Sequence, residues 1–261
     1  MRVKEIVQVN IPFTMLYESY LGRFIGYRLN PEIGLDAEAL DRHSLSDFER
    51  IAESLCNAGL FITLHGPFVD MSPGSPDPKI SRVTRDRFEQ VLRLIPIFRP
   101  KTVVFHMGYD PKRYYYMKDI WVEKSLELWS WVAQGVQDEG TSLMLENVYE
   151  HGPDDIRILF ETLGRERAGF CLDTGHQAVF SRVPLDSWVD SLGPFIGQLH
   201  LHDNSGTQDD HLGLGQGRID FKWLLTRLNA MKGNPPTITL EPHREKDLWP
   251  SLQYLEEVLP W

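Results

Sequence analysis

Short apolar segments rich in β-branched residues alternate with longer amphipathic segments along the whole chain. The short segments have the composition of buried strands, and the longer ones carry apolar residues at a spacing near 3.6, which predicts helices. Eight strands are expected, at Glu5–Val9, Pro31–Leu35, Leu60–His65, Thr102–His106, Ser142–Glu146, Ala168–Asp173, Phe195–Leu201 and Thr237–Glu241. Helices are expected at Ser46–Ala58, Ile80–Phe98, Ile120–Asp138, Asp155–Leu163, Phe221–Met231 and Leu248–Val258.

This repeated strand–helix unit predicts a parallel sheet with helical crossovers. Eight units close most naturally into a (β/α)₈ barrel, whose usual size of about 250 residues would use the whole chain. An open doubly wound sheet is the alternative, and it would bind its ligand at one switch point instead of around a ring. No linker, charge block or change in composition marks a boundary, so we predict one domain, residues 1–261.

Three segments are less regular. Phe13–Phe24 fits either a short helix or a loop, and Leu35–Ser44 is polar enough to cross the barrel mouth. Met71–Lys79 is rich in Pro and Gly and is expected to be an irregular loop that lines the catalytic face. Ser46 and Asp220 are expected to cap the helices that follow them.

The composition is that of an ordinary globular protein, with 42% hydrophobic and 25% charged residues. No apolar run is long enough to span a bilayer, and no signal-peptide core is visible at the N-terminus. Cys56 and Cys171 are expected to be buried and reduced, which predicts a cytoplasmic protein. A net charge of −10 argues against a broad nucleic-acid surface, although bound metal ions would offset acidic charge locally.

Six consecutive predicted strands end in, or within one residue of, a potential metal ligand. These residues are His65, His106, Glu146, Asp173 (with His176 three residues on), His200 and Glu241. The carboxyl ends of barrel strands meet at one mouth, so these side chains should converge there. Only 37 acidic residues and 9 histidines occur among 261 residues, so six successive matches are improbable by chance.

Each of these residues has an ordinary explanation on its own, as a hydrogen-bonded histidine or a helix-capping carboxylate. Together they do not, because Glu146 and Glu241 end apolar runs, and burying several carboxylates without cations is prohibitive. Without metal we expect the carboxylates to repel, so that at least one has a raised pKa. A mixed His and carboxylate set suits Zn, Mn, Co or Fe better than Mg or Ca. One to three divalent ions per chain, of Zn, Mn or Co, are therefore expected.

A second polar cluster follows the seventh predicted strand. It contains Asp209, Asp210 and His211 before a Gly-x-Gly turn, and it is explained equally well by further ligands or by a plain polar loop. Cations and one aromatic residue near the predicted mouth are candidates for binding substrate: Phe68, Lys112, Arg113, Arg218, His243 and Arg244. A few cations suit one phosphate group better than a duplex.

From His-Gly-Pro-Phe at 65–68 to Leu-Glu-Pro-His-Arg at 240–244, these motifs resemble the xylose-isomerase-like barrel superfamily. That superfamily holds sugar and sugar-phosphate isomerases and epimerases together with AP endonucleases of the endonuclease IV type. The isomerase branch implies one metal, held by Glu146, Asp173, His200 and Glu241. The endonuclease branch implies a three-metal cluster, whose nine ligands match His65, His106, Glu146, Asp173, His176, His200, Asp209, His211 and Glu241.

Two reactions can use this ring of residues. The favoured prediction is a metal-dependent isomerase or epimerase of a small sugar or sugar phosphate, in which Glu146 and Glu241 move a proton between adjacent carbons and the metal stabilises an enediolate. The alternative is a multi-metal phosphoesterase acting on a small or nucleotide-like substrate. A metal-binding barrel without catalysis is the third interpretation. The expected partner is a small molecule, nucleic acid is an unfavoured partner, and the chain is expected to be a monomer or a homo-oligomer.

Overall fold

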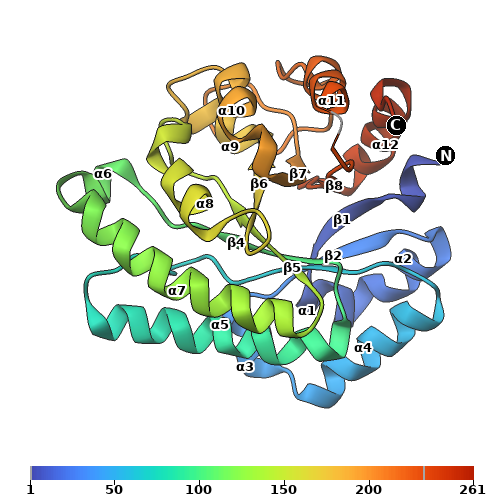
Figure 1. Cartoon of the computed structure of the whole chain (residues 1–261). Coiled ribbons are helices and arrows are strands. Elements are labelled where there is room, and N and C mark those ends of the chain that lie inside the picture. The colour runs from blue at the N-terminus through green and yellow to red at the C-terminus, as the bar shows by residue number, and fades with distance from the viewer. Residues whose placement is uncertain (1, 232) are drawn as a thin grey trace.

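The eight strands form a closed barrel in sequence order, each parallel to its neighbours (Figure 1). The structure, a computed structural model, describes residues 2–231 and 233–261; Met1 and Lys232, which belong to the predicted domain 1–261, lie outside the described residues. The barrel closes where β1 pairs with β8, with Val9 opposite Leu240. This closure confirms the (β/α)₈ prediction and excludes the open doubly wound sheet.

The observed strands agree with the predicted ones to within a few residues. They are β1 (Val7–Pro12), β2 (Asn30–Gly34), β3 (Thr63–His65), β4 (Thr102–His106), β5 (Ser142–Glu146), β6 (Gly169–Asp173), β7 (Ile196–Leu201) and β8 (Thr237–Leu240). The first strand is shifted toward Pro12, and the third strand begins at Thr63 and not at Leu60. The Phe61 N–H donates to the Asn30 side chain there, so this backbone bonds a side chain instead of a neighbouring strand.

The helices on the outside of the barrel include more short segments than the sequence predicted. The main helices are α2 (Leu21–Tyr27), α3 (Ala37–Arg42), α4 (Leu45–Asn57), α5 (Pro78–Phe98), α7 (Lys118–Asp138), α8 (Arg157–Leu163), α9 (Thr174–Phe180), α10 (Leu185–Leu192), α11 (Phe221–Ala230) and α12 (Glu245–Val258). Shorter turns are η1 (Val3–Glu5), α1 (Phe13–Met15), the π-helix η2 (Leu16–Tyr20), α6 (Pro111–Tyr114), η3 (Tyr115–Met117), η4 (Pro153–Asp155) and η5 (Gly193–Phe195).

The uncertain segments resolve in different ways. The chain from Phe13 to Tyr27 is helical, and α3 lies within Leu35–Ser44. The sequence did not predict α9 or α10, which are helices of only seven and eight residues.

Two helix caps were predicted, and one of them was wrong. Helix α4 is capped by Ser44 and not by Ser46. The Ser44 hydroxyl accepts from the Asp47 N–H while the Asp47 carboxylate accepts from the Ser44 N–H, which is a capping box. Asp220 caps α11 as predicted.

The main apolar core lies between the barrel and its helices. Phe105 of β4, Phe88 of α5 and Trp129 of α7 are fully buried and in contact, with ring centroids 4.5 Å apart for Phe88 and Phe105. Inside the barrel the apolar part is a small cluster of Val104, Met144 and Cys171. The strand positions nearer the mouth are polar, and the mouth is the end of a barrel at which active sites lie.

Several further predictions can be compared with the described chain. Cys171 is buried and Cys56 is exposed on α4, so the prediction that both are buried was wrong for Cys56; both are free thiols. None of the described helices is long and apolar enough to cross a membrane. The two ends of the chain lie side by side (Figure 1), because the backbone N–H groups of Arg2 and Val3 donate to Glu256 of α12.

Candidate metal centre

Glu146, the last residue of β5, is the centre of the cluster at the barrel mouth. Its side chain is buried, and its Oε2 lies 3.1 Å from His65 Nε2, 3.4 Å from His106 Nε2 and 3.3 Å from His200 Nδ1. Its Oε1 lies 3.3 Å from His176 Nδ1. One carboxylate therefore faces four imidazole rings that come from β3, β4, β7 and α9.

The carboxylates of β6 and β8 lie beside the same rings. Glu241, which follows β8, has its Oε1 3.1 Å from His200 Nδ1. Asp173, at the end of β6, caps α9 by accepting from the His176 N–H at 2.6 Å. This cap explains why His176 follows Asp173 by three residues, because a first-turn residue then points back toward the strand end.

The loop after β7 brings the last two candidates to the cluster. His211 Nε2 lies 3.2 Å and His176 Nε2 lies 3.5 Å from the same oxygen of Asp209. His211 Nδ1 also lies 3.8 Å from Glu241. The structure thus brings all nine residues of the predicted ligand set together at the carboxyl ends of the strands.

The predicted substrate contacts divide into two groups. Phe68 is half exposed and stacks on His106, with centroids 4.6 Å apart, and His243 stacks on His211 at 3.7 Å. Arg244 is held by Asp247 at 2.6 Å instead of facing the centre. The remaining cations are Lys112 and Arg113 on α6 and the exposed Arg218. Within the described part of the chain, none of these three side chains forms a hydrogen bond or ion pair with the nine predicted metal ligands.

Sequence reasoning missed two buried groups at this centre. His202 Nε2 lies 3.1 Å from Asp173 Oδ1, and its ring stacks on His211 at 3.7 Å. Glu32 of β2 is fully buried, with its Oε1 2.9 Å from His200 Nε2. A signal existed for His202, because positions 200 and 202 lie on the same face of a strand. Glu32 sits in mid-strand, so attention to strand ends alone could not find it.

Electrostatics within the cluster differ from the repulsion that was expected. Burial alone would raise the pKa of Glu146 and Glu241, but the neighbouring histidines outweigh it and hold both pKa values below the ordinary range. Burial lowers the pKa of His176, yet Asp173, Asp209 and Glu146 raise it well above its usual value. The expected upward pKa shift of a cluster carboxylate was therefore wrong for Glu146, Glu241 and Asp209, because the imidazoles supply positive charge.

The residues present fit divalent metal ions. His200 Nδ1 is buried and has no hydrogen-bond partner among the described residues, although oxygens of Glu146 and Glu241 lie within 3.3 Å. A nitrogen facing two carboxylate oxygens without hydrogen bonds is the arrangement expected around a shared cation. Sets of donor atoms within 4.8 Å of one another include His65 with His106 and Glu146; Glu146 with Asp173 and His176; Glu32 with His200 and Glu241; and His176 with His202, Asp209 and His211.

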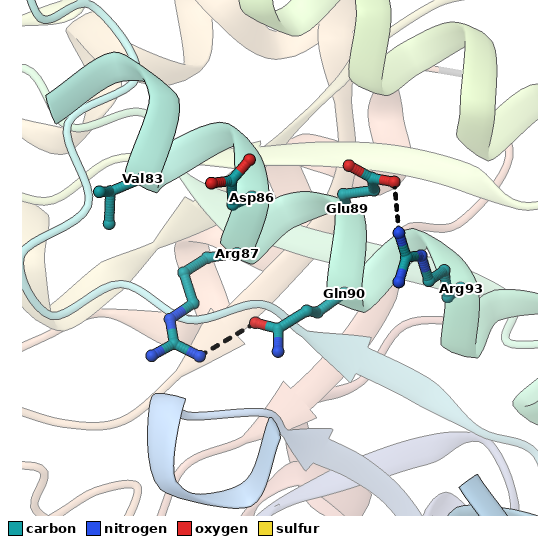
Figure 2. A pocket seen from close by; sticks show the side chains of 6 residues that line it. All are labelled: Val83, Asp86, Arg87, Glu89, Gln90 and Arg93. Atoms are coloured by element: carbon teal, nitrogen blue, oxygen red, sulfur yellow. Dashed lines mark hydrogen bonds and ion pairs between the residues drawn. The ribbon is translucent and has the colours of Figure 1, made fainter. Parts of the chain in front are cut away.

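A hollow of about 450 Å³ lies elsewhere, along α5 (Figure 2). Its lining residues all come from that one helix, and its two arginines are already paired, Arg87 with Asp41 and Arg93 with Glu89. It therefore has none of the convergent chemistry of the barrel mouth.

Comparison with known proteins agrees with this geometry. A protein of Methanocaldococcus jannaschii, MJ1614, is 30% identical over 208 residues, which cover 76% of this chain and 77% of its own. The structure of the TTHB071 protein from Thermus thermophilus, soaked with ZnCl₂, is 27% identical with a TM-score of 0.81 and covers 97% of both chains. A D-tagatose 3-epimerase-like protein has the same TM-score at 22% identity, over 97% of this chain and 96% of that one. The family model described as xylose isomerase-like TIM barrel matches residues 27–261, and the chain belongs to that family.

Proposed function

We propose that this protein hydrolyses a phosphoester of a small molecule with two or three divalent ions at the barrel mouth. The observation that carries the proposal is the position of Glu146 between separate groups of ligands. Its Oε2 faces His65, His106 and His200, whereas its Oε1 faces His176, which forms a separate set of possible ligands with Asp173. A reaction with one metal held by Glu146, Asp173, His200 and Glu241 does not use His65 and His106.

The third group of ligands strengthens this proposal. His176, Asp209 and His211 are linked through one Asp209 oxygen, with distances of 3.5 and 3.2 Å. A one-metal site built on Glu146, Asp173, His200 and Glu241 does not need them. Three groups of ligands around a common centre suit neighbouring ions that bind the two sides of one phosphate.

The charge of the centre leads to the same conclusion. Glu146, Asp173, Asp209 and Glu241 carry four negative charges when ionised, and Glu32 adds a fifth beneath them. One divalent ion would leave the centre negative, whereas two or three bring it close to neutral or positive, as binding of an anion requires. Divalent ions would supply Lewis-acid stabilisation of the phosphoryl oxygens and a lowered pKa of the attacking water.

The chain's own residues limit the substrate to a small molecule. Phe68 covers the His65 and His106 side of the mouth, and His243 covers His211. Arg244 is tied to Asp247, and the net charge is −10, so little of the surface would hold a polyanionic backbone. We therefore infer that the phosphate is held at the centre itself and that the rest of the substrate meets an aromatic rim.

Elemental analysis combined with one double variant tests the proposal. Wild-type protein should carry two or three Zn or Mn ions per chain and hydrolyse p-nitrophenyl phosphate or bis-p-nitrophenyl phosphate. Asp209→Ala with His211→Ala should lose one ion per chain and the hydrolysis. Asp210→Ala is the matched control, because Asp210 lies on the same loop and bonds Ser205 and Gln208 instead of the centre. One ion per chain, unchanged in the double variant, would refute hydrolysis by several metals.

Isomerisation or epimerisation of a sugar or sugar phosphate is the second candidate. Two observations favour it: both Glu146 and Glu241 lie within 3.3 Å of His200 Nδ1, and the fold is like that of a D-tagatose 3-epimerase-like protein. One ion there would have a carboxylate on each side of a bound sugar, ready for proton transfer. In D₂O such a reaction incorporates deuterium at the substrate carbon, which NMR detects and which hydrolysis does not cause. The double variant should then retain its ion.

A further inference from the structure

We infer that Glu32 is a positioning residue for metal binding, which acts by fixing the nitrogen of His200 that faces the centre. The inference rests on the proposed function only in requiring that the centre binds a metal ion. Glu32 belongs to β2 and His200 to β7, and both side chains are fully buried inside the barrel.

The hydrogen bonds of Glu32 leave one of its oxygens for His200. Oε2 accepts from Thr63 Oγ1 at 3.0 Å, from Thr239 Oγ1 at 2.9 Å and from Gln198 Nε2 at 2.6 Å. Oε1 lies 2.9 Å from His200 Nε2, off the line of an ideal hydrogen bond, and no other described group bonds it. Oε1 is therefore available only to a proton on His200 Nε2.

The orientation of Gln198 is itself fixed from across the barrel. Thr102 of β4 donates to Gln198 Oε1 at 2.6 Å, which leaves the amide NH₂ group to face Glu32. β4 and β7 are not neighbours in the barrel, so this bond crosses the interior. Glu32 is thus held by side chains from β3, β7 and β8, and it has little freedom to turn away from His200.

Two groups compete for His200 Nε2. Gln198 Nε2 lies 3.3 Å away and would donate to an unprotonated Nε2, whereas Glu32 at 2.9 Å requires a proton there. The carboxylate is favoured in this competition, because its negative oxygen attracts the proton over the shorter distance, and because the Gln198 amide already donates to Glu32 Oε2 and Thr239 Oγ1. Once a metal ion is bound, the single proton of His200 therefore lies on Nε2.

A proton on Nε2 leaves the lone pair on Nδ1, which faces Glu146 at 3.3 Å and Glu241 at 3.1 Å. Carboxylates that hold metal-bound histidines in this way fix the tautomer and raise the basicity of the ligand. A buried carboxylate that bonds only neutral donors is costly unless a cation balances it. A metal ion bound to His200 Nδ1 would supply that positive charge through the ring, and it would offset the cost of burying the Glu32 carboxylate.

Zinc binding by Glu32→Gln tests this inference without reference to activity. Competition with a fluorescent chelator should show one Zn²⁺ ion bound about 10- to 100-fold more weakly than in the wild type. Glu32→Asp keeps the charge and should recover part of the affinity. In a His200→Ala background, Glu32→Gln should change the Zn²⁺ affinity no further. Thr141→Val is the control, since it removes a buried hydrogen bond to Pro100 away from the centre and should leave zinc binding unchanged.

Unchanged zinc affinity and stoichiometry in folded Glu32→Gln would overturn the inference, and a further loss in the His200→Ala background would do the same. If Glu32→Gln does not fold, zinc-loaded wild-type protein labelled with ¹⁵N-histidine decides, because NMR must then detect the His200 proton on Nε2 and not on Nδ1. A wild-type protein that binds Zn²⁺ but hydrolyses no phosphoester contradicts the proposed reaction alone, and the zinc affinities of the Glu32 variants still decide the inference about Glu32. Failure of the wild type to bind Zn²⁺ overturns both.

Discussion

Glu150→Gln should make the stability of this protein less dependent on pH. Glu150 lies in the loop after β5 and is 2% exposed. Its Oε2 accepts from the Val148 N–H at 2.6 Å, and its Oε1 has no hydrogen-bond partner among the residues described. Burial raises the pKa of Glu150 to about 8. The folded protein therefore favours the protonated form of this side chain.

The sign and size of the effect follow from that pKa. A carboxyl with a raised pKa in the folded state contributes its full stability below its ordinary value of 4.5, and this contribution falls as pH rises toward 8. At 1.36 kcal/mol for each pH unit, the loss is about 5 kcal/mol in total. Between pH 5.5 and pH 8.5 it is about 3 kcal/mol. Glutamine has no proton to lose, so Glu150→Gln avoids this loss.

Urea unfolding of both proteins across that pH range, in the presence of a chelator, measures the difference directly. Near pH 5.5 the two free energies of unfolding should be similar, and by pH 8.5 the variant should have gained about 3 kcal/mol relative to the wild type. Glu49→Gln on the exposed face of α4 is the matched control and should give a flat difference. A flat difference for Glu150→Gln as well would refute the argument from burial.

Other expectations concern the metal centre and its loops. Chelation should lower the melting temperature by several degrees, since an ion present at 1,000 times its Kd stabilises the folded state by about 4 kcal/mol; an unchanged melting temperature after proven metal loss contradicts a metal-organised site. Gly175→Ala should destabilise the protein by about 1–3 kcal/mol, because the added Cβ overlaps the His202 ring, whereas Gly22→Ala in α2 meets nothing and should be neutral or stabilising in the same thermal melts. Asp203→Asn should lower stability by about 1–3 kcal/mol and speed proteolysis of the loop that follows β7, since the Asp203 carboxylate accepts from the N–H groups of Gly215, Gly217 and Ile219. Equal cleavage rates in the variant and the wild type would count against this role.

The alternation of apolar strands and amphipathic helices was enough to predict the barrel, because each unit is local in sequence and buries its apolar face in only one way. The same logic identified His65, His106, Glu146, Asp173 and His200, since each lies at or next to the last position of a strand. Their convergence follows from closure of the barrel. The sequence also indicated Asp209 and His211 as metal ligands, but a plain polar loop explained their pattern equally well.

Tertiary structure alone decided which residues act through others. Glu32 reaches His200 across the barrel from a strand that is not its neighbour, a contact that no local pattern encodes. Arg244 follows β8 closely in the sequence, which suggested a place at the mouth, yet its guanidinium binds Asp247 three residues further on. Cys56 follows an apolar residue but faces solvent, because the opposite side of α4 packs on the barrel. The periods of strands and helices fix the fold, whereas pairing across the barrel depends on closure and register, which only the assembled structure contains.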